Sequence, residues 1–97
     1  MNFNLLTASD KDKTAIENLM QFYIYDFSEF IKYDVEETGQ FAPYPHLEDF
    51  WSDPDKFPYI IKKVGFLAGF VLVKFVRSEV QHYFSIAEFF IMKKYRH

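Results

Sequence analysis

The sequence contains no cysteine, and this absence removes disulfide bonds, thiolate metal sites and cysteine nucleophiles from consideration. Only three glycines are present, Gly39, Gly65 and Gly69, so the chain holds no glycine-rich phosphate loop. No apolar run approaches the roughly 18 residues of a membrane span, and the N-terminus lacks a basic segment followed by an apolar one. We therefore expect a soluble, cytoplasmic protein with no membrane partner.

Positive charge and chemical motifs are also scarce. The formal net charge is −3, and the only basic cluster is the segment 93–96. Binding to nucleic acid through phosphate neutralisation requires a clustered excess of Lys and Arg, so we expect no nucleic-acid partner. The three histidines are far apart in sequence, and no serine lies in a G-x-S-x-G frame. We therefore expect neither a metal site nor a nucleophile-elbow hydrolase.

Aromatic side chains are what the sequence has in abundance. It contains 13 Phe, 7 Tyr and one Trp among 97 residues, with 49% hydrophobic and 26% charged residues. This composition excludes a disordered chain and supplies the material for a packed core. The length is that of one domain, residues 1–97.

The first third of the chain predicts a strand followed by a helix. The apolar segment 3–9 is typical of a strand, and Ser9 with Asp12 has the spacing of a capping box at a helix start. Apolar residues then recur at intervals of three and four, which predicts an amphipathic helix, either long or broken in two near 25–29. These residues are Ile16, Leu19, Met20, Tyr23, Phe27, Phe30 and Ile31.

The remainder predicts a long loop and three strands. Segment 38–58 carries all four prolines and many aromatic residues, which indicates a loop with a turn of helix across 45–51. A lid, a substrate wall and a simple cover for the core all remain open for it. Segments 59–64 and 65–76 predict a hairpin that turns near 63–65, and 81–92 predicts a last strand. The fold class is therefore α+β, in the order β-α-α-β-β-β.

Glu88 is the first candidate for a catalytic residue. In a strand, alternate side chains share a face, so Glu88 would lie in a row with Phe84, Ile86, Phe90 and Met92. Desolvation among such neighbours raises the pKa of a carboxyl group toward neutrality, as a general base requires. The alternative is a glutamate at a sheet edge, or one bonded to backbone or to a lysine.

Other candidates are less specific. Tyr25 and Asp26 fall off the main apolar stripe of the helix, so they face either a cleft or solvent. Tyr44, His46 and Trp51 in the loop either line a pocket or pack against the sheet. These residues alone do not name a reaction.

Three segments, taken in order, carry a resemblance to a known family. "IENLMQFYIYDFSEF" (16–30) is similar to paired first helices, and "FPYIIKKVGFLAGFVLVKF" (57–75) to second and third strands that often read P-Y-x-I-K and then G-x-x-A-G-F-x-L-V. "IAEFFIMKKYRH" (86–97) resembles a fourth strand and its exit. Over nearly all of its length the chain resembles the N-terminal half of the GNAT superfamily of N-acetyltransferases. This resemblance implies an acyl-CoA N-acyltransferase fold with a mainly antiparallel sheet.

The resemblance also implies roles for particular residues, with acetyl-CoA as co-substrate and a small amine or a peptide amine as acceptor. Glu88 matches the fourth-strand carboxylate that is the general base in some members. Segment 90–92, which is Phe90, Ile91 and Met92, matches the strand end that binds the pantetheine arm. Tyr25, Asp26 and Tyr44 fall in the region that usually forms the amine-substrate wall.

The end of the sequence corresponds to the start of the family's pyrophosphate-binding motif, R/Q-x-x-G-x-G/A. Arg96 and His97 match its first two positions, so the resemblance implies a chain that stops within the motif. We expect acetyl transfer by the isolated chain to be impaired or absent. The alternative is a non-catalytic dimerisation or partner-binding module. In either case an uncovered fourth strand predicts a homodimer through that strand.

Overall fold

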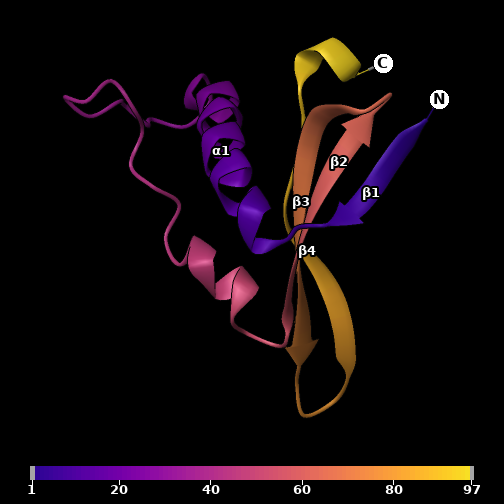
Figure 1. Cartoon of the computed structure of the whole chain (residues 1–97). Helices are drawn as coiled ribbons and strands as arrows, with labels where there is room; N and C mark the ends of the chain where they lie inside the picture. The colour runs from indigo at the N-terminus through magenta and orange to yellow at the C-terminus, as the bar shows by residue number, and fades with distance from the viewer. Residues whose placement is uncertain (1, 97) are drawn as a thin grey trace.

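A four-stranded antiparallel sheet organises residues 2–96, which are the residues that the computed structural model describes (Figure 1). The strands run side by side in chain order, β1-β2-β3-β4. Their bounds are Phe3–Thr7 for β1, Lys56–Lys63 for β2, Phe66–Arg77 for β3 and His82–Ile91 for β4. One α-helix, α1 (Lys13–Ser28), and three 3-10 turns complete the fold, so the α+β prediction is confirmed. The 3-10 turns are η1 (Asp10–Asp12), η2 (Leu47–Trp51) and η3 (Lys93–Tyr95).

Helix α1 begins and ends through local hydrogen bonds. At its start, the Ser9 N–H donates to Asp12 Oδ2 at 2.8 Å, which confirms the expected cap, although η1 intervenes before α1. At its end, Ser28 Oγ donates to the Tyr25 carbonyl at 2.7 Å, a bond that offers the backbone an alternative to the helix. Within the described residues no second α-helix follows, so the paired-helix prediction is wrong. Phe30, which would have continued the apolar stripe, is 79% exposed and contributes nothing to the core.

The turn between β2 and β3 explains the hairpin that the sequence predicts. Val64 and Gly65 both have positive φ, 51° and 82°. Two consecutive residues in this region make the type of tight turn whose twist matches that of paired strands. Gly65 adopts the conformation without strain, whereas Val64 is branched at Cβ and adopts it at a cost.

A β-bulge interrupts β4 next to the candidate catalytic residue. Leu72 pairs with Glu88, but the next residue, Val73, pairs with Ile86. Ala87 is therefore an extra residue on β4. Beyond a single extra residue, each side chain of the strand points to the face opposite to the one that strict alternation predicts.

The bulge overturns one prediction. Phe84 and Ile86 do not share the face of Glu88. The Phe84 ring lies 4.8 Å from that of Phe75 and 5.9 Å from that of Phe57, on the face away from α1, and Ile86 is 65% exposed. Strict alternation along β4 fails because it assumes a strand without a bulge.

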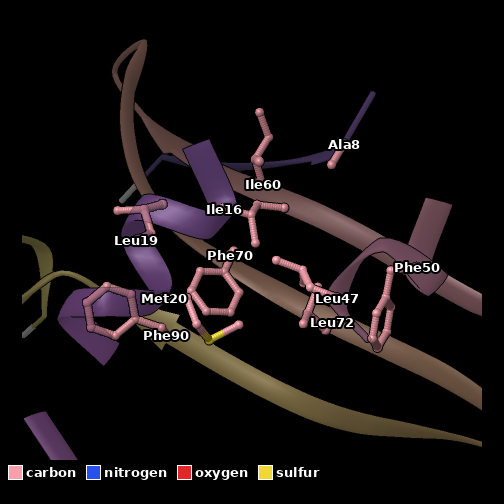
Figure 2. Close-up of a cluster of buried hydrophobic side chains, with 10 residues drawn as sticks. All are labelled: Ala8, Ile16, Leu19, Met20, Leu47, Phe50, Ile60, Phe70, Leu72 and Phe90. Atoms are coloured by element: carbon pink, nitrogen blue, oxygen red, sulfur yellow. The ribbon is translucent and has the colours of Figure 1, made fainter. Parts of the chain in front are cut away.

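The hydrophobic core lies between α1, η2 and the near face of the sheet (Figure 2). Ile16 and Met20 of α1 point toward Phe70 and Leu72 of β3, and all four are at most 1% exposed. Phe90 joins this core and Met92 packs against it, so both lie on the face of Glu88, as expected. The core comprises Ala8, Ile16, Leu19, Met20, Leu47, Phe50, Ile60, Phe70, Leu72 and Phe90.

The opposite face of the sheet is apolar and, within residues 2–96, carries no α-helix (Figure 1). We call it the open sheet face. Its exposed members include Phe3, Leu5, Phe84, Ile86 and Phe89. Within the same residues, no helix is long and apolar enough to cross a membrane.

Candidate functional site

Glu88 lies where β4, α1 and the loop before η2 meet. The Tyr23 hydroxyl of α1 donates to Glu88 Oε1 at 2.5 Å. The Tyr44 hydroxyl of the loop donates to Glu88 Oε2 at 2.8 Å. Each carboxylate oxygen thus accepts one hydrogen bond, which leaves lone pairs for a further donor.

The carboxylate affects the titration of both tyrosines. Burial raises the pKa of Tyr44 to about 12, together with its hydrogen bond to Glu88 and the nearby negative charge. Burial also raises the pKa of Tyr23, again with the hydrogen bond to Glu88 and its charge. Both side chains therefore remain neutral hydroxyl donors at physiological pH. Glu88 does lie at a sheet edge, as one alternative expected, because β4 is an edge strand, but its partners are two tyrosines and not backbone or a lysine.

Tyr23 is oriented by other aromatic rings. Its ring makes edge-to-face contacts with Phe27 at 5.0 Å and with Phe70 and Phe90 at 5.8 Å each, between ring centroids. Such pairs prefer edge-on geometry, and three of them restrict the ring to one position. The hydroxyl that contacts Glu88 is therefore fixed by the core.

Gln21 fixes the loop that carries Tyr44. Its amide nitrogen donates to the Phe41 carbonyl at 3.1 Å, and its amide oxygen accepts from the Phe41 N–H at 2.9 Å. This paired bond joins α1 to the loop three residues before Tyr44. Further along, Trp51 Nε1 donates to the Ser9 carbonyl at 3.0 Å, so Trp51 anchors the loop rather than lining a pocket with Glu88.

A pocket of about 510 Å³ opens beside Glu88, and we call it the aromatic pocket. Five rings contribute to its wall: Tyr23, Phe27, Tyr33, Phe41 and Tyr44. Its two acidic groups are Asp34 and Glu88, and its remaining lining is aliphatic. The loop 38–58 thus lines a pocket in part, and through Leu47 and Phe50 it also covers the core, one of the three alternatives that the sequence left open.

A second pocket, of about 350 Å³, lies between α1 and the outer edge of β4, and we call it the edge pocket. It shares Tyr23 and Phe27 with the aromatic pocket. Phe90, Ile91 and Arg96, which the resemblance places at the cofactor, all line it.

Asp26 also lines the edge pocket and is bound there by Arg96. Arg96 Nη2 lies 2.6 Å from Asp26 Oδ2, and Arg96 Nε donates to the Ile91 carbonyl. The Asp26 carboxylate therefore lies apart from Glu88 and Tyr44, the other expected site residues. Tyr25 is 68% exposed and lines neither pocket. His97 lies outside the described residues.

Gly69 allows β3 to approach the end of β4 closely. A Cβ atom at this position would lie 2.0 Å from the Phe90 carbonyl oxygen, which is far inside contact distance. The Met92 N–H donates to the neighbouring Ala68 carbonyl at 2.8 Å and continues this close pairing. Gly69 therefore fixes the course of the 90–92 segment beside the edge pocket.

One further cluster has the composition of a cation site. Oxygen or nitrogen atoms of His46, Glu48 and Asp49 lie within 4.8 Å of one another at the start of η2. Asp49 also pairs with Lys56 at 3.8 Å, and His46 and Glu48 are exposed. We assign no metal to this cluster, because an exposed acidic group with a lysine partner is common without one.

Among the candidates from the sequence, the structure brings together Glu88 with Tyr44, and Asp26 with Arg96. Tyr23 and Gln21 were missed, because helical spacing identifies an apolar stripe but not the polar tip of a residue within it. No family model matches the chain, and no curated protein matches it. The function is therefore inferred from the geometry around Glu88.

Proposed function

We propose that this chain is a GNAT-like N-acetyltransferase domain, with Glu88 as the general base and acetyl-CoA as the co-substrate. The observation that carries the proposal is the position of Glu88 in the wall of an aromatic pocket that adjoins the edge pocket through Tyr23 and Phe27. The antiparallel order β1-β2-β3-β4 agrees with the sheet that the resemblance implies. The single α-helix departs from the paired helices of that resemblance.

The edge pocket suits one part of acetyl-CoA. It is lined by apolar side chains and by the end of β4, a strand that pairs on one side only. The Ile91 carbonyl already accepts from Arg96 Nε and the Phe90 carbonyl lies against Gly69, so Phe90 and Ile91 would hold the pantetheine arm through the apolar surface that they give to the edge pocket. Arg96 is the cation in the lining of the edge pocket, and it is paired with Asp26. The residues present therefore fit the pantetheine arm of acetyl-CoA better than its pyrophosphate.

Glu88 would take the proton from the acceptor amine. Acetyl-CoA supplies the acetyl thioester when bound. The amine nitrogen forms a bond to the acetyl carbon, the carbon–sulfur bond breaks, and the thiolate leaves. An acceptor that binds as an ammonium ion first gives one proton to a free lone pair of Glu88, directly or through one water, and the second proton, lost after the nitrogen attacks, goes to the leaving thiolate. Tyr23 and Tyr44 hold the carboxylate in place for this transfer.

Thermal unfolding with and without millimolar acetyl-CoA tests whether the co-substrate binds. A ligand at about 100 times its dissociation constant adds about 2.7 kcal/mol, which corresponds to a rise of several degrees in Tm. Acetate at the same concentration is the control, because it lacks the arm that the edge pocket would hold. An equal Tm in all three samples would contradict the proposal.

A second candidate is a non-catalytic module that forms a homodimer through β4. The observation in its favour is the exposure of Phe84 at 66%, Ile86 at 65% and Phe89 at 55% on the open sheet face. Strand β4 is also an edge strand without Lys or Arg, and its one carboxylate, that of Glu88, is bound to Tyr23 and Tyr44. Edge strands without charged residues pair readily with a second copy.

A further inference from the structure

We infer that the aromatic pocket binds a small organic ammonium ion that carries an apolar body, such as an arylalkyl or alkyl primary amine. The inference names the acceptor of the proposed acetyl transfer and in that sense rests on the proposed function. The binding step itself needs no co-substrate. It follows from the charge, the rings and the hydrogen-bonding capacity of the pocket wall.

The charge of the pocket selects a cation. Its wall carries two carboxyl groups, Asp34 and Glu88, and among residues 2–96 no Lys, Arg or His contributes to it. Opposite charge raises the local concentration of a cationic ligand, and low-dielectric walls strengthen this effect. An anionic ligand of the same shape would face two like charges without a counter-ion.

The rings of the pocket fit both ends of the proposed ligand. Tyr33, Phe41 and Tyr44 come from the segment between α1 and η2, and Tyr23 and Phe27 come from α1, so aromatic groups face the pocket from two sides. Aromatic faces attract an ammonium ion through the ring quadrupole. They also bury an alkyl or aryl body. A volume of about 510 Å³ is within the range of small-molecule sites.

Glu88 distinguishes a primary ammonium from other cations. Its oxygens accept one hydrogen bond each from Tyr23 and Tyr44, and the remaining lone pairs have no partner among the described side chains. A primary ammonium has three N–H donors for these lone pairs, whereas a quaternary ammonium has none. We therefore expect a primary amine to bind more tightly than its trimethylated analogue.

Calorimetric titration of the whole chain with matched probes, in the absence of acetyl-CoA, tests the inference. The probes are 2-phenylethylamine, its neutral isostere 2-phenylethanol and the anion 3-phenylpropanoate. We expect the amine to bind about ten times more tightly than the alcohol, and the anion not to bind. Equal affinity for the amine and the alcohol would overturn the inference.

Two variants of exposed acidic residues, one in the pocket wall and one outside it, give a second measurement without threatening the fold. Asp34→Asn should weaken amine binding about three-fold or more and leave alcohol binding unchanged. Glu29→Gln is the control, because Glu29 is exposed and lines neither pocket. An equal loss of amine affinity in both variants would show that the overall charge of the chain governs binding. That result would contradict a role for the pocket.

The binding and transfer results separate the two proposals. Amine binding without acetyl transfer would support the pocket assignment and count against the acetyltransferase. Acetyl transfer to other amines, with no binding of these probes, would overturn the pocket assignment alone.

Discussion

At the scale of single residues, the arrangement of Glu88 between two tyrosines has a consequence at high pH. The pKa of Tyr44 is raised to about 12 in the folded chain, from an ordinary value of 10.0. A folded state that holds its proton more tightly is stabilised below the unfolded pKa, and this contribution is lost as pH rises through the folded pKa. The unfolding free energy should therefore fall between about pH 10 and about pH 12.

Urea unfolding across that range tests this prediction. Tyr44→Phe should fall less steeply than the wild-type chain, because Phe has no proton to lose. Tyr25→Phe is the matched control, because Tyr25 is 68% exposed and is not bonded to Glu88. Identical pH profiles for the wild type and Tyr44→Phe would show that the hydrogen bond to Glu88 does not couple to folding.

The type of a residue does not reveal which partner its polar group will meet, and this limits what the sequence can predict about the site. Glu88 was found because a carboxylate in an apolar strand is unusual. Tyr23 was assigned to the core, and its ring does pack there, but its hydroxyl reaches Glu88. Gln21 gave no signal, since a polar residue on a helix is ordinary, and its bond to Phe41 depends on how the loop returns to α1.

At the scale of elements, the β2–β3 turn contains a residue that is poorly suited to its conformation. Val64 has φ of 51°. The left-handed region costs about 1–2 kcal/mol for a residue with a side chain, and Asn tolerates it better than a branched residue does. Val64→Asn should therefore raise the unfolding free energy by about 1 kcal/mol.

Chemical denaturation of two variants checks this. Val80→Asn is the control, because Val80 is 91% exposed and is not among the described residues with positive φ. If Val64→Asn were no more stable than Val80→Asn, the turn would not have the strain that its backbone angles indicate.

Elements were predicted well where a pattern is local. The first strand, the cap at Ser9, the hairpin turn and the helical turn before β2 follow from spacing and turn residues. The bulge at Ala87 could not be predicted in the same way, because the side chains of β4 are mostly apolar on both faces. Such a sequence lacks the alternation of apolar and polar residues from which a change of register could be recognised. The end of α1 depends on the Ser28 bond and on the lack of a surface to bury Phe30.

At the scale of the whole molecule, the sheet is covered on one face only. The core packs under α1 and η2, while Phe84, Ile86 and Phe89 are more than half exposed on the other face. Exposed apolar patches of this kind mark interaction surfaces. We predict that the chain forms a homodimer through β4 and this face.

Light scattering after size-exclusion chromatography measures the mass directly. Ile86→Lys should shift the population from dimer toward monomer, because a charge on the open sheet face opposes burial. Val64→Lys is the control, since Val64 is also exposed but lies at the hairpin turn. A wild-type chain that remains monomeric at concentrations near 1 mM would contradict the prediction.

The central claim is that Glu88 acts as a base toward an amine, and one measurement tests it most directly. The release of free thiol from acetyl-CoA is followed with 2-phenylethylamine for the wild type, Glu88→Gln and Glu29→Gln. The glutamine is isosteric and its amide oxygen can still accept from one of the two tyrosine hydroxyls, while its amide N–H can donate to the other, but it cannot take a proton. We predict slow but measurable transfer by the wild type and by Glu29→Gln, in keeping with the impaired activity expected of the isolated chain, and a further loss of about 10²–10⁴-fold in Glu88→Gln. Equal rates in all three proteins, or no transfer by any of them, would contradict the account.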